Sequence, residues 1–297
     1  MVDKPADLSS AQTVAVVRRI LKARKIGHTG TLDPFAEGVL VCCVNQATKI
    51  ARFLVQGSKT YEAVLRLGIE TDTQDATGNV VSVCREVALT EHQIRRVFNS
   101  FHGSIEQQPP VYSALKHRGT PLYKLARRGK PVQKPSRPVN IFSIEVQEIQ
   151  LPWVRFSVSC SAGTYIRTLC SDIGRVLGCG GHLQGLKRTA SSGFDLHQAF
   201  SLQELRQLAQ AGKVAECLIP MTLALPGMPT HIADDGLENK IRHGQAIPIH
   251  HISPDVMEAL KRKTDPYLKI IDQRNRLLTI LAFDRDAARL KYCCVIQ

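Results

Sequence analysis

Apolar and polar residues alternate along several stretches of this chain, and this alternation is typical of a half-buried β-strand. It is clearest at residues 139–149 and 154–159, which are close enough in sequence to form a hairpin. Residues 59–67 predict a further strand, and the unbroken apolar run at 39–44 predicts a buried one. We expect these strands to build one long sheet.

Helices are predicted where apolar residues recur every three or four positions, or where a capping box precedes an apolar run. Ser9 or Ser10 caps the first of them, while Thr90 and Ser201 each precede a glutamine or glutamate by three residues. The predicted helices cover approximately residues 9–24, 46–54, 90–101, 161–178 and 201–211.

The sequence pattern of the chain changes at residues 226–229, where the run Pro-Gly-Met-Pro is typical of a linker. Beyond it the pattern is one of short strands and turns. A length of 297 residues suits two domains better than one. The sequence therefore predicts a larger domain at residues 1–225 and a small β-rich module at 229–297.

The composition adds a strong positive charge. Lysine and arginine outnumber aspartate and glutamate by 39 to 26, a net charge of +13, which indicates a polyanionic partner. Nucleic acid is the first candidate and an acidic membrane surface is the second. No stretch approaches the ~20 apolar residues of a membrane span, and charged residues interrupt any N-terminal leader, so we expect a cytoplasmic protein.

The nine cysteines form no C-x-x-C pair, and their spacings do not match those of zinc sites. We interpret them as reduced and mostly buried side chains. No metal ion is therefore expected.

Much of the positive charge is concentrated in residues 109–137. This segment holds eight cations and no acid, with Tyr112 and Tyr123 among them. Phosphate contact is one interpretation and a disordered basic linker is the other. The cations that we expect to contact RNA are Lys116, Lys124, Arg127 and Arg128.

The most unusual stretch is residues 27–38, which holds three glycines, a histidine and two carboxylates between apolar runs. Asp33 precedes a proline, so its backbone is driven towards extended geometry. A constrained loop that carries a carboxylate is suited to chemistry. Local composition alone leaves an ordinary turn as the alternative.

This stretch resembles the active-site motif G-H-[TS]-G-x-L-D-P of the tRNA pseudouridine synthase B family over eight consecutive positions. Residues 109–116, 161–168 and 180–189 are similar to other motifs of that family. Residues 71–78 match its D-T-x-D-x-x-G segment, although without the resemblance they predict an Asx-rich turn. The N-terminal motif D-K-P-x-G departs from the family, because Asp7 replaces its glycine.

The resemblance implies a mixed α/β (α+β) catalytic domain with a largely antiparallel sheet, a basic thumb at about 109–137 and a PUA-like RNA-binding module. The implied reaction converts uridine to pseudouridine at position 55, in the T-stem loop of tRNA. It breaks the N1–C1′ bond, turns the uracil and joins C5 to C1′, and it needs no cofactor. We expect a monomer.

The resemblance also assigns the reacting groups. Asp33 would be the nucleophile, at either ribose C1′ or uracil C6, with Arg167 as the partner that keeps it ionised. An arginine at a helix start is poorly placed for the helix dipole, which makes a carboxylate partner elsewhere more attractive. Without the resemblance, an ordinary surface arginine is an equal alternative. Tyr61 would stack on the uracil and help to remove the C5 proton.

Three further residues would shape the pocket. Tyr165 and Leu186 would line it, and His28 would fill the space left when the target base flips out. Without the resemblance, His28 is equally compatible with an ordinary core or surface histidine.

Two other functions fit the same basic surface. A non-catalytic tRNA-binding or tRNA-folding protein would use the cations but not Asp33. An RNA methyltransferase would need a site for a methyl donor, and no glycine-rich fingerprint follows a strand and opens a helix in this sequence.

Overall fold

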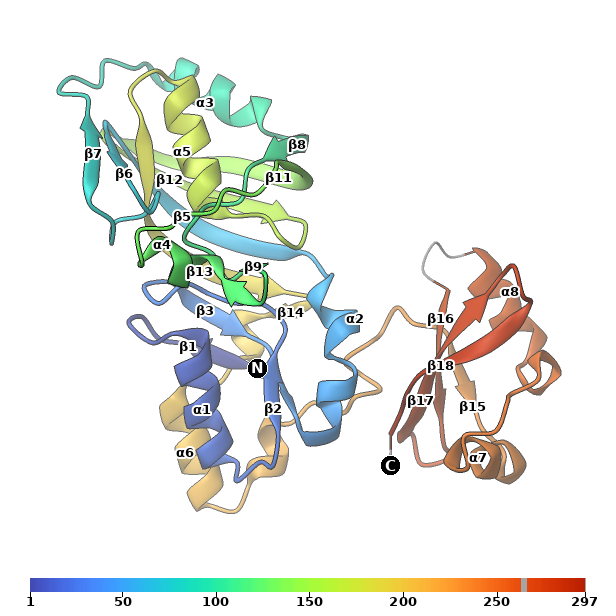
Figure 1. The fold of residues 1–297 in the computed structure, drawn as a ribbon. Helices are drawn as coiled ribbons and strands as arrows, with labels where there is room; N and C mark the ends of the chain where they lie inside the picture. Colours follow the sequence, from blue (N-terminus) through green and yellow to red (C-terminus); the bar gives the residue numbers. More distant parts are fainter. Residues whose placement is uncertain (263–265, 297) are drawn as a thin grey trace.

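The computed structural model describes residues 1–262 and 266–296 (Figure 1). Its centre is an eight-stranded sheet in the order β1-β3-β13-β5-β12-β11-β8, with β14 paired to β13. All neighbours are antiparallel except β3 and β13. The strands are β1 (Val2–Lys4), β3 (Glu37–Leu40), β5 (Lys59–Leu67), β8 (Gly103–Gln107), β11 (Arg137–Gln150), β12 (Trp153–Cys160), β13 (Gly181–Ser191) and β14 (Phe194–Asp195).

Short two-stranded sheets and helices surround this sheet. The paired short strands are β2 (Ile26–His28) with β4 (Cys42–Val44), β6 (Ile69–Thr71) with β7 (Val80–Val83), and β9 (Lys116–His117) with β10 (Thr120–Pro121). The helices of this part are α1 (Ser10–Ile20), α2 (Ala51–Val55), α3 (Glu91–Ser100), α4 (Leu122–Ala126), α5 (Ile166–Val176) and α6 (Leu202–Gln210).

The main core lies where α3 and α5 cover the sheet (Figure 1). Along β5 every second residue is buried, and this face packs against the helices. Phe98 of α3 meets Phe156 of β12 edge to face, with ring centroids 5.1 Å apart. A second, smaller core forms where α1 and α6 pack together beside β1.

The predicted α+β class with a largely antiparallel sheet is confirmed, as are the strand at 59–67 and the hairpin of β11 and β12. The capping boxes at Thr90 and Ser201 are both present. The first helix was predicted too long, because it ends at Ile20 and Lys22 adopts a φ of 49°. The run at 39–44 is divided between β3 and β4, which join different sheets.

The C-terminal part builds its own sheet, in the order β15-β16-β17-β18, around a separate apolar core. Its elements are β15 (Thr230–Ile232), α7 (Asp235–Arg242), α8 (Pro254–Arg262), β16 (Tyr267–Ile271), β17 (Leu277–Asp284) and β18 (Arg289–Val295). The expected β-rich module is therefore present, with two helices that the pattern of short strands did not predict. The division of the chain at residues 225–229 stays a prediction.

This module also contacts the larger part of the chain. The rings of Phe53 and Tyr267 meet edge to face at 5.0 Å. Lys49 donates from Nζ to the carbonyl of Val295 at 2.8 Å. Among the residues that the structure describes, no helix has both the length and the apolar character needed to cross a bilayer.

Asp7 replaces a family glycine, and its backbone shows what that glycine does. Its φ is 63°, in the left-handed region that glycine enters without steric cost. Aspartate is among the residues that tolerate this region best, since its short side chain can bond locally. The departure from the motif therefore preserves the turn that leads from β1 to α1.

The position of α5 depends on a close approach between helix and strand. A Cβ built on Gly174 of α5 would lie 2.4 Å from the backbone nitrogen of Gly181 in β13. Backbone atoms in a strand cannot move aside as a flexible side chain can. Gly174 therefore sets how closely α5 lies on the sheet.

We expect Gly174→Ala to lower the free energy of unfolding by about 1–3 kcal/mol, the usual cost of overpacking a core. The measurement is denaturant unfolding followed by circular dichroism. Gly227→Ala is the matched control, because a Cβ there meets nothing within 4 Å. Equal stability of the two variants would show that α5 does not depend on the glycine contact.

Candidate active site

Asp33 lies in the loop between β2 and β3, and two neighbouring elements hold this loop in place. Ser10, at the start of α1, accepts a hydrogen bond from the nitrogen of Leu32 at 2.8 Å and donates to its carbonyl at 3.0 Å. The Nζ atom of Lys4 donates to the carbonyl of Pro34 at 3.0 Å. The backbone on both sides of Asp33 is therefore anchored.

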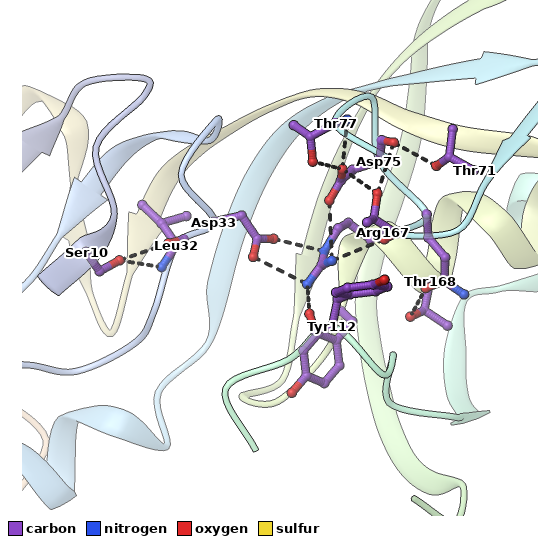
Figure 2. Close-up of polar contacts among 12 residues, drawn as sticks. Ser10, Leu32, Asp33, Thr71, Asp75, Thr77, Tyr112, Arg167 and Thr168 are labelled. Atoms are coloured by element: carbon purple, nitrogen blue, oxygen red, sulfur yellow. Dashed lines mark hydrogen bonds and ion pairs between the residues drawn. The ribbon is translucent and has the colours of Figure 1, made fainter. Parts of the chain in front are cut away.

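Arg167, at the start of α5, pairs with the Asp33 carboxylate as Figure 2 shows. Arg167 Nε lies 3.0 Å from Oδ2, and Nη2 donates to Oδ1 at 3.3 Å. The Arg167 side chain is 5% exposed, whereas that of Asp33 is 32% exposed. The pair thus places a buried cation behind a carboxylate that solvent or a substrate can reach.

A second carboxylate holds the other side of the guanidinium. Asp75, in the loop between β6 and β7, accepts from Arg167 Nη1 at 3.3 Å through Oδ2 (Figure 2). Its Oδ1 accepts from the Thr77 nitrogen at 2.9 Å and from the hydroxyls of Thr73 and Thr77 at 2.8 and 2.6 Å. The Asx-rich turn predicted here is present, and its aspartate anchors Arg167.

Sequence reasoning did not assign this role to Asp75. The available signal was that a guanidinium has five N–H donors and one aspartate cannot satisfy them all. Within residues 1–262 and 266–296, no three His, Cys, Asp or Glu side chains are grouped to hold a metal ion.

Two backbone carbonyls complete the surroundings of Arg167. Nη1 donates to the carbonyl of Thr73 at 3.1 Å, and Nη2 donates to that of Tyr112 at 2.8 Å. Tyr112 belongs to the basic segment at 109–137, so the base of that segment touches the site directly. A single side chain therefore joins four stretches of the chain.

The start of α5 is fixed by a neighbour from β8. Gln107, which is 1% exposed, accepts from the nitrogen of Tyr165 at 2.7 Å and donates to its carbonyl at 3.0 Å. Tyr165 is the N-cap residue of α5 and makes no side-chain cap, and Gln107 pairs with both backbone groups of this residue. This amide places Tyr165 and, two residues later, Arg167.

The charges of the site follow from this burial. Burial raises the pKa of the Asp33 carboxyl above its ordinary value, and the adjacent Arg167 guanidinium opposes this rise. Burial also raises the pKa of the Tyr61 phenol. Tyr61 is therefore a neutral phenol at neutral pH, suited to stacking and to hydrogen-bond donation.

Three other predicted pocket residues, Tyr61, Leu186 and His28, are all buried or half-buried. Tyr61 belongs to the same apolar cluster as Leu32, the residue before Asp33, and Leu186 packs against that cluster. His28 lies five residues before Asp33, and its Nδ1 accepts from the Gly30 nitrogen at 3.4 Å. Burial lowers the pKa of His28, so its imidazole is neutral at neutral pH.

The segment at 109–137 is only partly regular, with β9, β10 and α4 joined by turns. Most of its cations are exposed, whereas Arg137 donates to the carbonyl of Gly163. Within the part of the chain that the structure describes, none of the following four has a carboxylate within 4 Å, and all are exposed: Lys116, Lys124, Arg127 and Arg128.

Comparison with known proteins agrees with this geometry. Residues 18–166 match the family described as the TruB family pseudouridylate synthase N-terminal domain. Residues 167–226 match the tRNA pseudouridylate synthase B C-terminal domain. Together the two matches contain the Asp33 loop, Arg167 and the basic segment.

Curated relatives match over most of the chain. The tRNA pseudouridine synthase B of Geobacter sulfurreducens is 48% identical over 225 residues, which cover 76% of this chain and 74% of the relative. That of Alkaliphilus oremlandii is 44% identical over 266 residues, covering 90% and 88%. Among solved structures, a Cbf5–Nop10–Gar1 complex contains a chain with a TM-score of 0.76 and 26% identity, covering 100% of this chain and 84% of that one.

The fold and the two family matches define a pseudouridine synthase. The chain belongs to the TruB family of pseudouridylate synthases. This membership favours an isomerase over the methyltransferase that the sequence left open.

We expect Asp75→Asn to weaken the site and the fold together. The change removes one charge of a buried ion pair and leaves Arg167 partly uncompensated, which costs about 3 kcal/mol of unfolding free energy. Denaturant unfolding measures this loss. Asp72→Asn is the control, because Asp72 is exposed in the same loop and bonds only Asn79. A loss no larger than that of the control would show that Asp75 does not hold Arg167.

Proposed function

We propose that this protein converts uridine to pseudouridine in tRNA, at position 55 of the T-stem loop. The pairing of Asp33 with Arg167 carries the proposal, because it presents a carboxylate backed by a buried cation at a partly exposed position. The names of the curated relatives support tRNA as the substrate. The proposed location is the cytoplasm, where such a substrate is found.

In this mechanism Asp33 is the nucleophile. Attack on C1′ breaks the N1–C1′ bond, and the bonding electron pair leaves with the uracil. Attack on C6 instead places the electron pair on the uracil ring before the glycosidic bond breaks. In both cases the uracil turns, C5 bonds to C1′, the C5 proton is lost and the aspartate is released. Arg167 keeps Asp33 ionised and aimed throughout.

The target base must leave its stack to reach Asp33. Tyr61 stacks on the uracil, and Tyr165 and Leu186 line its pocket. His28 fills the space that the base leaves in the T-loop. Stacking does not depend on ionisation of Tyr61, whereas accepting the C5 proton would require its phenol to ionise first.

RNA affinity comes from the basic thumb at 109–137. Its exposed cations include Lys116, Lys124, Arg127 and Arg128, and these four can meet phosphates because no carboxylate of the described residues lies within 4 Å of them. Asp33, Arg167 and Tyr61 all come from one chain, which supports action as a monomer. A role in tRNA folding would use the same surface without Asp33.

We expect Asp33→Asn to abolish isomerisation and to leave tRNA binding intact. Asparagine preserves the size of the side chain but removes the negative charge and the nucleophilicity. The measurement is single-turnover pseudouridine formation on an unmodified tRNA transcript, with filter binding on the same preparation. Glu37→Gln is the control, because Glu37 is an exposed acid four residues away.

Near-normal turnover of Asp33→Asn would remove Asp33 from the role of nucleophile. A parallel loss of binding and turnover would instead assign it a structural role. A tRNA-folding activity that survives in this variant would be separate from the isomerisation.

We expect neutralisation of Lys124, Arg127 and Arg128 together to weaken tRNA binding. Each lost phosphate contact should reduce the slope of log K against log salt by about 0.7–0.9. Titrations at several salt concentrations measure this slope. The control neutralises Arg155, Arg175 and Lys213, which are exposed but already paired with carboxylates. An unchanged slope in the thumb variant would mean that the thumb does not meet the RNA backbone.

A further inference from the structure

Arg188 of β13 is a buried cation that the mechanism above does not use. It is 1% exposed and is among the largest fully buried side chains in the described chain. Its Nε donates to the carbonyl of Val39 at 2.7 Å, and its Nη2 donates to that of Gly30 at 3.0 Å. No carboxylate of the described residues lies within 4 Å of it.

A guanidinium buried without a counter-ion is costly to the fold. Two carbonyls reduce the cost but do not neutralise the charge. Apolar side chains of similar volume usually fill such a position with equal or better stability. The unpaired charge of Arg188 therefore calls for a reason beyond packing.

The position of Arg188 beside Tyr61 provides one. The two residues are direct partners in the β5–β13 ladder, so their side chains leave the same face of the sheet. Burial raises the pKa of the Tyr61 phenol, and the charge and hydrogen bonding of Arg188 oppose that rise. At His28 burial lowers the pKa, and the charge of Arg188 acts in the same direction. The charge is therefore felt at two residues of the proposed uracil pocket.

The third nitrogen of the Arg188 guanidinium, Nη1, is 3.4 Å from the place where a Cβ on Gly30 would stand, so the loop passes close to the guanidinium. Nε and Nη2 donate to backbone carbonyls, and Nη1 is the nitrogen still available to donate to the Tyr61 hydroxyl. The other charged or titratable groups that act on Tyr61 are Cys160 of β12 and Asp33.

We propose that Arg188 is a positioning residue that acts through Tyr61 and stabilises the negative charge that develops on the uracil. Attack at C1′ sends the N1–C1′ electron pair to the uracil, and attack at C6 also places an electron pair on its ring. A neutral Tyr61 hydroxyl donates a hydrogen bond to a uracil oxygen, and the N–H donated by Arg188 strengthens that bond. The inference rests on the proposed function.

The test combines Arg188 variants with Tyr61→Phe in single-turnover assays on an unmodified tRNA transcript. Arg188→Met should slow pseudouridine formation about 100-fold, as loss of a pre-organised donor does. Arg188→Lys keeps the charge and should lose less. In the Tyr61→Phe background, Arg188→Met should cost only about threefold, because the route through the hydroxyl is already absent. The dissociation constant of tRNA should stay within twofold, since Arg188 is buried.

Arg66→Met is the matched control. Arg66 lies on β5, five residues after Tyr61, and stacks over Trp153 at 4.8 Å, away from the site. It should leave the single-turnover rate unchanged. Circular dichroism on all variants identifies any that do not fold, and if Arg188→Met is one of them, Arg188→Lys carries the same cycle.

A second readout needs no catalysis. Histidine resonances assigned with a His28→Gln variant report the pKa of His28 by NMR titration. Arg188→Met should raise that pKa, because it removes the positive charge, and Arg188→Lys should raise it less. A merely structural role of Arg188 would not separate the two variants in this way.

The outcomes are distinct. Equal rate losses from Arg188→Met with Tyr61 and with Phe at position 61 would overturn the inference, as would an unchanged rate in a folded Arg188 variant. Absence of pseudouridine with the unmodified protein would overturn the proposed function instead. In that case an unchanged His28 pKa in Arg188→Met would also refute the electrostatic part of the inference.

Discussion

The site depends on one buried guanidinium that must satisfy several partners at once. Arg167 contacts Asp33, Asp75 and two backbone carbonyls, which come from three separate stretches of the chain. Each partner constrains the direction of the planar fork, so the Asp33 carboxylate is oriented by the sum of these contacts. Asp75 lies on the buried side of the guanidinium, and Asp33 lies on the side that is partly exposed.

The fold supplies this geometry through close packing behind the site. Gly174 lets α5 lie directly on β13, and Gln107 fixes the first turn of that helix. The loop of Asp33 is anchored from the other side by Ser10 and Lys4. The Asp33 loop and α5 are each held by their own contacts, and the carboxylate and the guanidinium meet where these two elements come together. The tertiary structure, and not the local sequence, therefore pre-organises the pair.

Positive charge is distributed in two layers with different physical roles. The exposed cations of the thumb are suited to phosphates and are sensitive to salt. The buried cations Lys4, Lys59 and Arg188 are held by carbonyl oxygens, and burial lowers the pKa of each of the two lysines to about 8. The base of the thumb also contacts a buried cation, because the carbonyl of Tyr112 accepts a hydrogen bond from Arg167.

The sequence by itself determined the local features: strand β5, the capped helices α3 and α6, and the loop with Asp33 before a proline. These features depend on residues a few positions apart, and their signals are therefore readable along the chain. A family resemblance was needed to pair Asp33 with Arg167, 134 residues away. Only the tertiary structure decided that Asp75 shares this arginine and that Arg188 is the ladder partner of Tyr61. It also decided that Gly174 is the point where α5 lies closest to β13. Such contacts follow from strand order and helix placement, which no local pattern encodes.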